Sequence, residues 1–492
     1  MHICRKRTSS SGHFALLLLC LLLVITSCKE KAPPKEVPKE TSLEKTKGIK
    51  LEETRLATIS EDYDRWGNIS FSADGHLVLY TARKRDKEFL VAVSADSEDI
   101  SPAYESVSWL VRSPDGRRFA FGGKKGEKKH LVIDNKELKE PYYEEVAPGS
   151  FSPDGRLVAC EVGGLKEKKW FIFVSDGEKE VYRSKVYPDT YRAPSFSPDG
   201  RLLVYELGDD KREAGNKKRT VFFLDLSAGK IIKERRYTEG EESGRFAFSA
   251  DSSRVIYEVG KEGKISLVLH DFSLNEEREM ELPYASIGRL ALSPDGKKIV
   301  YIATKEGKHY LVESLWESPA QGKERGPYEG IGPAVFSPDS LTVAFLAMEK
   351  GKWQSVVGDK EGAAVYDGVG NAPVFSPDGT MIAYPAMKKG KWVMVISPVG
   401  NPSLVKEGSA YDMVVTPVWS PDGKYITYRA RTGTMEEAKR FIVIADAKTG
   451  KVIKEGPVCD EVWPPVFSPD GKSVAYGVRI GSELWWKVEP VP

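Results

Sequence analysis

Residues 151–162, Phe-Ser-Pro-Asp-Gly-Arg-Leu-Val-Ala-Cys-Glu-Val, carry the pattern that decides the fold. An aromatic residue precedes Ser-Pro-Asp-Gly, and a run of apolar and β-branched residues follows it. Ser-Pro-Asp-Gly suits a tight turn, because proline presets φ, aspartate can accept a hydrogen bond from nearby backbone, and glycine tolerates a positive φ. The stretch therefore predicts two strands joined by a turn.

This pattern occurs ten times in the chain of 492 residues. A third apolar run follows each motif, as in residues 170–174, and a more polar fourth run leads to the next motif. Four strands in a repeat of 44 residues on average are typical of a propeller blade. We therefore predict an all-β protein with ten four-stranded blades over residues 51–492. Each repeat contributes one aspartate to a structural turn: Asp74, Asp115, Asp154, Asp199, Asp251, Asp295, Asp339, Asp378, Asp422 and Asp470.

The repeat lengths and the termini bear on whether the blades form one ring or two. Repeats 2, 3 and 4 match repeats 7, 8 and 9 in length, and residues 227–234 resemble residues 448–455. Two abutting five-bladed rings are the alternative that this duplication supports. However, the last repeat ends after a third strand near Leu484–Val488, and Leu51–Ala57 resembles an outer strand. An N-terminal strand that completes the last blade would cover an exposed sheet edge, so the sequence favours a single ten-bladed ring.

The composition excludes two broad classes. Hydrophobic residues make up 40% of the chain, which argues against wholesale disorder. Lys and Arg number 73 against 72 Asp and Glu, a net charge of +1, whereas a nucleic-acid binder carries a basic excess. We expect no nucleic-acid partner.

Residues 1–27 have the features of a targeting signal. Arg5, Lys6 and Arg7 precede an apolar run of 13 residues, Phe14–Thr26, which is too short for an ordinary membrane span. The run ends in small residues before Cys28 and resembles the signal of bacterial lipoproteins. The resemblance implies cleavage before Cys28, lipid attachment there, and a location in the cell envelope at the outer membrane, facing the periplasm. Residues 28–50, rich in Lys, Glu and Pro, are then a flexible tether.

The Phe-Ser-Pro-Asp-Gly repeats resemble the TolB-type, WD40-like propeller repeats of bacterial envelope proteins. Similar repeats occur in the propellers of prolyl-oligopeptidase-type peptidases. The resemblance covers residues 51–492 and implies a scaffold fold that serves many functions. The smaller N-terminal α/β domain of TolB has no counterpart here, because the tether occupies that place.

The sequence predicts no catalytic residues, no metal site and no cofactor. It lacks a Gly-x-Ser-x-Gly elbow, a phosphate-binding loop, a His-Glu-x-x-His motif and a Cys-x-x-Cys motif. An aspartate repeated ten times is expected to serve structure, since a catalytic residue would be singular. The remaining candidates are isolated histidines, which we expect to be structural, two thiols expected to be free and buried, and tryptophans expected to pack within blades. They are His76, His130, His270, His309, Cys160, Cys459, Trp170, Trp353, Trp392 and Trp486.

These observations favour a non-catalytic, lipid-anchored envelope scaffold or adaptor that binds another envelope protein. One alternative is a propeller-type lyase or glycosidase, whose carboxylates would converge on the channel. Another is a module that binds carbohydrate or peptide through tryptophans.

Overall fold

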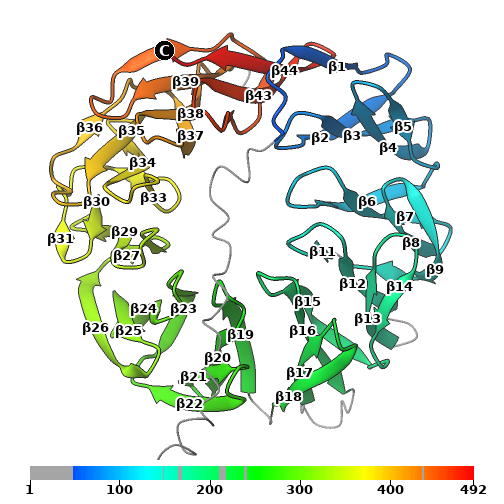
Figure 1. Ribbon diagram of the computed structural model, residues 1–492, viewed down its shortest axis with the longest axis horizontal. Coiled ribbons are helices and arrows are strands. Elements are labelled where there is room, and N and C mark those ends of the chain that lie inside the picture. The colour runs from blue at the N-terminus through cyan, green and yellow to red at the C-terminus, as the bar shows by residue number, and fades with distance from the viewer. Residues whose placement is uncertain (1–47, 148, 165–168, 210–217, 238–240, 435–436) are drawn as a thin grey trace, which may run out of the picture. The chain divides into compact units, whose positions relative to one another are not determined.

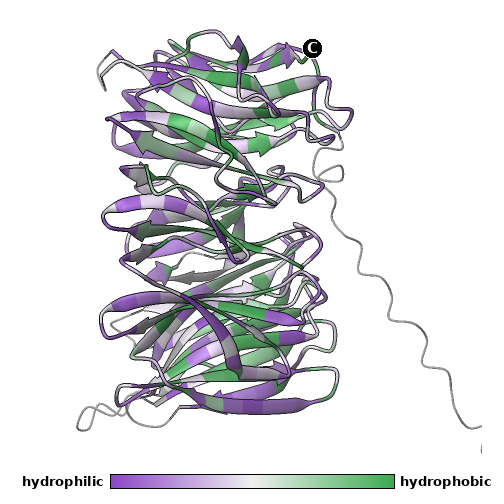
Figure 2. Ribbon diagram, turned by 90° about the vertical axis from the view of Figure 1, so that its left-hand side faces the viewer, coloured by the Kyte–Doolittle hydropathy of each residue, from purple (hydrophilic) through white to green (hydrophobic). Residues whose placement is uncertain are grey.

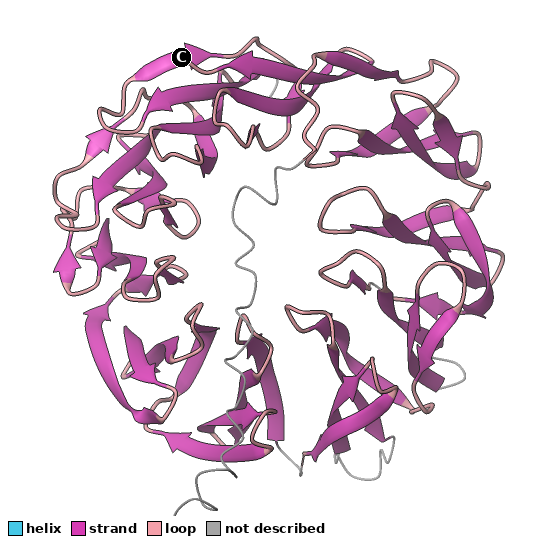
Figure 3. Ribbon diagram, viewed as in Figure 1, coloured by secondary structure: helices cyan, strands magenta, loops and turns pink. Residues whose placement is uncertain are grey.

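The computed structural model describes residues 48–492 except 148, 165–168, 210–217, 238–240 and 435–436. The described residues form strands, turns and loops, as Figure 3 shows, and contain no helix. This part of the chain therefore contains no helix that is long and apolar enough to span a membrane. Cys28 and residues 1–47 lie outside the described residues.

The strands form ten antiparallel sheets, which follow one another as the blades of a single ring in Figure 1. In each blade the chain runs from an innermost to an outermost strand. Blades 1–5 contain β2 (Arg65–Phe71), β3 (Leu77–Lys84), β4 (Lys87–Ser94) and β5 (Glu98–Ile100); β6 (Ser106–Arg112), β7 (Phe119–Lys125), β8 (Lys128–Ile133) and β9 (Lys136–Tyr143); β10 (Glu145–Val146), β11 (Ser150–Phe151), β12 (Val158–Gly164), β13 (Lys169–Ser175) and β14 (Glu180–Arg183); β15 (Asp189–Phe196), β16 (Leu202–Asp209), β17 (Lys218–Asp225) and β18 (Lys230–Arg236); β19 (Glu241–Phe248), β20 (Arg254–Lys261), β21 (Lys264–Asp271) and β22 (Glu276–Leu282).

Blades 6–10 repeat this order. In blades 3, 7, 8 and 10 the innermost strand consists of two short pieces that pair with the same neighbour. The strands are β23 (Ser286–Leu292), β24 (Lys298–Lys305), β25 (Lys308–Leu315) and β26 (Ser318–Tyr328); β27 (Gly330–Ile331), β28 (Val335–Phe336), β29 (Val343–Glu349), β30 (Lys352–Val357) and β31 (Lys360–Glu361); β32 (Gly368–Val369), β33 (Val374–Phe375), β34 (Met381–Lys388), β35 (Lys391–Pro398) and β36 (Lys406–Glu407); β37 (Met413–Trp419), β38 (Tyr425–Thr432), β39 (Lys439–Asp446) and β40 (Val452–Glu455); β41 (Glu461–Val462), β42 (Val466–Phe467), β43 (Ser473–Ile480), β44 (Glu483–Pro490) and, from the N-terminal end, β1 (Thr54–Thr58).

The N-terminal strand closes the ring. β1 pairs with β44 in antiparallel register, with Thr54 opposite Trp486 and Thr58 opposite Glu483. The predicted single ten-bladed ring, completed by an N-terminal outer strand, is confirmed. The alternative of two five-bladed rings is wrong, because all ten sheets follow one another in one ring and β1 completes the tenth blade.

The hydrophobic core is divided among the interfaces between blades. Ten clusters of buried residues each combine side chains from two neighbouring blades, and each interface has one cluster. In Figure 2 the hydrophobic segments lie within the stacked blades, and the hairpin tips are mainly hydrophilic. A single blade is hydrophobic on both faces and so requires a neighbour on each side.

Trp486 is central to the closing interface. Its side chain is 2% exposed, and its Nε1 donates a hydrogen bond to the Lys50 carbonyl at 2.8 Å. A Cβ atom at Gly75, in the first motif turn, would lie 2.1 Å from the indole, so only glycine allows this contact. Trp463 adds a hydrogen bond from its Nε1 to the Ile69 carbonyl at 3.1 Å. Blades 10 and 1 are thus joined by packing as well as by the β1–β44 pairing.

We predict that Trp486→Ala destabilises the protein by about 3–5 kcal/mol, because it removes a fully buried indole and its hydrogen bond. Chemical unfolding measures the loss, and hydrogen exchange should speed up first in β1 and β44. Trp392→Ala is the matched control, since that indole is only half-buried and lies away from the closure. Equal losses for the two variants, with no local exchange change, would contradict a special role for Trp486.

Candidate functional site

The ten motif aspartates stabilise ten separate turns, one in each blade. In every turn the motif serine hydroxyl donates to Oδ1 of the aspartate at 2.5–2.7 Å. The backbone N–H two residues after the aspartate donates to the same oxygen at 3.0–3.1 Å. These contacts hold the turn closed, and the carboxylates do not gather at one place.

The last position of the motif contacts the preceding blade. A Cβ atom at Gly116 would lie 2.8 Å from Cα of Ser72, which leaves room only for glycine there. Serine takes this position in two repeats, at Ser252 with φ 58° and Ser340 with φ 66°. Their hydroxyls accept hydrogen bonds from the backbone N–H of the preceding blade's motif aspartate, Asp199 at 3.0 Å and Asp295 at 3.1 Å. These hydrogen bonds offset the strain of a left-handed serine.

The turn carboxylates make stability depend on pH. The serine hydroxyl bond lowers the pKa of Asp339, Asp378 and Asp470. A folded-state pKa below the unfolded value of about 3.9 means that the carboxylate stabilises the fold above that pH. The stabilisation is lost as the pH falls through the folded-state pKa.

We predict that Asp378→Asn lowers the unfolding free energy at pH 7 by about 1 kcal/mol, because it weakens the bonds from Ser376 and Thr380. The difference from wild type should shrink as the pH falls from about 5 to about 3, since the protonated aspartate resembles asparagine. Urea unfolding at several pH values measures this. A gap of constant size at pH 3 and pH 7 would show that the charge of Asp378 does not matter.

The two cysteines among the described residues lie in non-adjacent parts of the ring, Cys160 in blade 3 and Cys459 just before blade 10. Cys28 falls outside the described residues, so its lipid attachment stays a prediction. Cys160 in β12 and Cys459 before β41 are both buried and unpaired. Burial raises the pKa of Cys459 to about 11 and also raises that of Cys160. Both thiols are therefore protonated at neutral pH and are poor nucleophiles.

The histidines are separated as well. His76, His130, His270 and His309 belong to blades 1, 2, 5 and 6. His76 Nε2 lies 3.1 Å from the Gly48 carbonyl oxygen, and His309 Nδ1 lies 3.2 Å from the Thr304 hydroxyl. Among the residues that the structure describes, no three His, Cys, Asp or Glu side chains form a group that could hold a metal ion.

Three of the tryptophans occupy a fixed place in the repeat. Trp170, Trp353 and Trp392 begin the third strand, and their backbones bridge to a tyrosine of the following connection. Trp170 is 7% exposed and Trp353 and Trp392 are half-buried. Trp486 does not share this place. Leu484 holds it, opposite Arg479, and Trp486 lies two residues further along β44.

The inner rim of the ring is irregular. In blades 1, 2, 4, 5, 6 and 9 the register of the innermost strand shifts, as in a β-bulge. A bulge re-aims the side chain at the break. Arg245 in β19 and Arg289 in β23 both stand three residues before their motif, and Arg289 has a positive φ of 51°. Arg192 in β15 stands four residues before its motif, so three consecutive blades carry an arginine at the rim.

A glutamate follows the buried aromatic or thiol residue in the second strand of three blades. Glu161, Glu206 and Glu258 occupy equivalent places in β12, β16 and β20. Glu161 accepts a hydrogen bond from the Thr190 hydroxyl at 2.6 Å. Glu206 lies 3.8 Å from Arg192 Nε and 3.7 Å from Arg219 Nη1. Two of these carboxylates therefore have partners within the protein.

Glu258 differs from the other two. It is half-buried, and the part of the chain that the structure describes offers it no hydrogen bond or ion pair within 4.0 Å. Burial raises its pKa, against the opposing charges of Arg192 and Arg245. The Glu258 side chain passes the inner strand at Gly244, where a Cβ atom would lie 1.6 Å from Cγ of Glu258. Glycine at 244 therefore makes room for this carboxylate.

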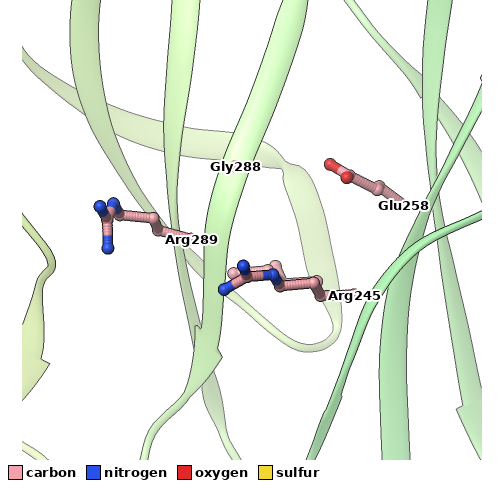
Figure 4. A pocket seen from close by; sticks show the side chains of 5 residues that line it. Arg245, Glu258, Gly288 and Arg289 are labelled. Carbon is pink, nitrogen blue, oxygen red and sulfur yellow. The ribbon is translucent and has the colours of Figure 1, made fainter. Parts of the chain in front are cut away.

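Arg245, Glu258, Gly288, Arg289 and Leu290 line a cavity of about 300 Å³ between blades 5 and 6. In Figure 4 the Arg289 guanidinium lies at the left, the Arg245 guanidinium near the centre and the Glu258 carboxylate at the right. Both arginines are exposed, and neither has a carboxylate within 4.0 Å among the described residues. This cavity is the candidate site.

Sequence reasoning did not single out these residues. Aligning the ten repeats on their motifs would have placed Arg245 and Arg289 in one column and Glu258 beside the buried Tyr257. These three residues differ from the residues at the same position in most other repeats, and motifs that recur in all repeats do not include them.

No protein-family model and no curated protein sequence matches the chain. Among solved structures, a eukaryotic initiation factor is 14% identical, with 79% of this chain and 96% of that chain covered and a TM-score of 0.48. TolB from Acinetobacter baumannii is 16% identical, with coverages of 59% and 78% and a TM-score of 0.28. Porphyromonas gingivalis dipeptidyl peptidase 4 is 11% identical, with coverages of 77% and 67% and a TM-score of 0.44. The ten-bladed ring itself is established by the strand pairing of this chain.

Proposed function

We propose that this chain is a lipid-anchored scaffold of the bacterial cell envelope, whose ring binds a partner protein without catalysing a reaction. The anchor is Cys28, residues 29–47 form the tether, and the ring faces the periplasm from the outer membrane. The predicted tether of residues 28–50 is too long at its end, because Ile49 packs in the closing cluster and Lys50 accepts a hydrogen bond from Trp486. The proposal for the anchor rests on the signal-like residues 1–27. The proposal for partner binding rests on an arc of exposed leucines.

The leucine arc consists of Leu274, Leu315, Leu341 and Leu404, which are 54–70% exposed. They belong to blades 5, 6, 7 and 8 and lie in or beside the turns at the same end of the strands as the Ser-Pro-Asp-Gly motif. Among the described residues only Leu51 is a comparably exposed leucine elsewhere. Exposed apolar side chains on four consecutive blades favour a protein-binding surface.

Contacts between the turns support a continuous surface. Lys298, which pairs with Leu315, donates through Nζ to the Leu341 carbonyl at 3.1 Å. Leu274 lines a small hollow with Trp316, the residue after Leu315. The Ser403 hydroxyl, beside Leu404, donates to the Glu361 carbonyl of the preceding blade at 3.2 Å. A partner could therefore contact several leucines at once.

We predict that replacing the four leucines of the arc by serine abolishes recovery of the partner from detergent-solubilised membranes, because it removes the apolar contacts. The exposed positions leave the fold intact, so the unfolding midpoint should change little. The matched control replaces three exposed valines at the opposite end of the strands by serine: Val186, Val365 and Val458. If both variants recover the same proteins as wild type, the arc does not bind a partner.

We predict that Cys28→Ala moves the protein from the membrane fraction to the soluble fraction, because the acyl chains supply the apolar area that holds it to the bilayer. Fractionation with immunodetection measures the shift, and the unfolding midpoint of the ring should not change. Lys29→Ala, which leaves the thiol in place, is the control. A membrane-bound Cys28→Ala protein would rule out this anchor.

A further inference from the structure

The cavity between blades 5 and 6 holds two exposed arginines and one glutamate, whose charge attracts Arg245 without an ion pair within 4.0 Å among the described residues. Arg245 and Arg289 have no ion pair or hydrogen bond from the residues that the structure describes. In blade 6 the place that Glu258 takes in blade 5 is occupied by Ile302, so no glutamate faces Arg289 from its own blade. Two exposed guanidinium groups on adjacent blades can each bind a carboxylate through two parallel hydrogen bonds.

The positive φ of Arg289, 51°, belongs to the bulge of the inner strand. The equivalent residues Asn68, Trp109 and Thr416, each three residues before its motif, also have a positive φ. A bulge re-aims the side chain at the break, and in blade 6 it places Arg289 in the lining of the cavity.

Glu258 requires a group of positive charge. Its half-buried carboxylate lacks a donor among the described residues, and leaving a charged group partly desolvated is unfavourable. Gly244 gives the side chain the room to reach the cavity. A ligand with an ammonium group beside its carboxylates would satisfy Glu258 together with the two arginines.

The size of the cavity limits the ligand. A volume of about 300 Å³ is at the lower end of small-molecule sites and suits one amino acid or the end of a peptide. Leu290 is the apolar residue of the lining and can contact the methylene groups of such a ligand.

We propose that this cavity binds a free acidic α-amino acid, with its two carboxylates on Arg245 and Arg289 and its ammonium group on Glu258. The site lies at the inner rim and is distinct from the leucine arc. This proposal can therefore be tested independently of the partner-binding proposal.

Isothermal titration of the full chain in detergent with L-glutamate, the peptide Glu-Ala-Ala and glutarate tests this site. Glutarate has both carboxylates of glutamate but no ammonium group. We expect saturable binding of glutamate. Glutarate should bind about tenfold more weakly because it lacks the ammonium group. The peptide should also bind more weakly, because its first residue keeps only the side-chain carboxylate.

Three variants assign the contacts. Arg245→Gln and Arg289→Asn should each weaken binding of glutamate about tenfold or more. Asparagine is chosen at 289 because it tolerates the positive φ. Glu258→Gln should lower the affinity for glutamate to that for glutarate and leave glutarate binding unchanged. Arg156→Ala removes an exposed arginine of blade 3 as a charge control and should change nothing.

Four results would overturn the proposal. The first is no saturable binding of glutamate up to about 10 mM. The second is equal affinity for glutarate and glutamate. The third is an equal loss in Arg156→Ala, which would indicate nonspecific charge attraction. The fourth is wild-type affinity in both rim arginine variants, with unfolding midpoints that show them to be folded.

Discussion

The structure depends on one constraint, namely that each blade is apolar on both faces and has no core of its own. The buried clusters lie between blades, so every blade stabilises two neighbours and is stabilised by them. An open row of blades would leave an apolar face at each end. Closure removes both ends, and the pairing of β1 with β44 achieves it with a strand from the opposite end of the chain. Residues that are far apart in the sequence, such as Gly75 and Trp486, are therefore in close contact.

A second repeated contact reinforces the stacking. The connection from one blade to the next carries a buried tyrosine whose hydroxyl donates to a glutamate on the outermost strand of the next blade. The pairs are Tyr104–Glu137, Tyr284–Glu324, Tyr328–Glu361, Tyr366–Glu407 and Tyr411–Glu455, at 2.6–3.0 Å. Burial raises the pKa of these phenols, so they remain hydrogen-bond donors at neutral pH. Each outer strand is thus tied to the connection that leads into its own blade.

The number of blades and the closing strand could be predicted from sequence because both depend on local, repeated chemistry. Ser-Pro-Asp-Gly is a turn wherever it occurs, and a last repeat short of one strand requires a strand from elsewhere. The role of Trp486 could not be predicted from its own repeat, because the Gly75 turn that it packs against belongs to the first blade and meets it only when the ring closes. The cavity was missed for another reason. Whether Arg289 points out of the ladder depends on a bulge, which leaves no consistent mark on side-chain alternation.

The residues that repeat and the residues that do not repeat serve different ends. A residue needed in every blade is needed ten times, so the motif aspartates recur around the whole circle, and the tyrosine–glutamate pair recurs at five interfaces. A binding site is needed once, and it must break the repeat where it occurs. Arg245, Arg289 and Glu258 break it at the inner rim of blades 5 and 6, and the exposed leucines break it on the turns of blades 5 to 8. Both departures fall in the same arc of the ring. The buried clusters between the blades do not include the rim arginines or the exposed leucines of blades 5 to 8, and this is the physical reason for proposing binding sites there.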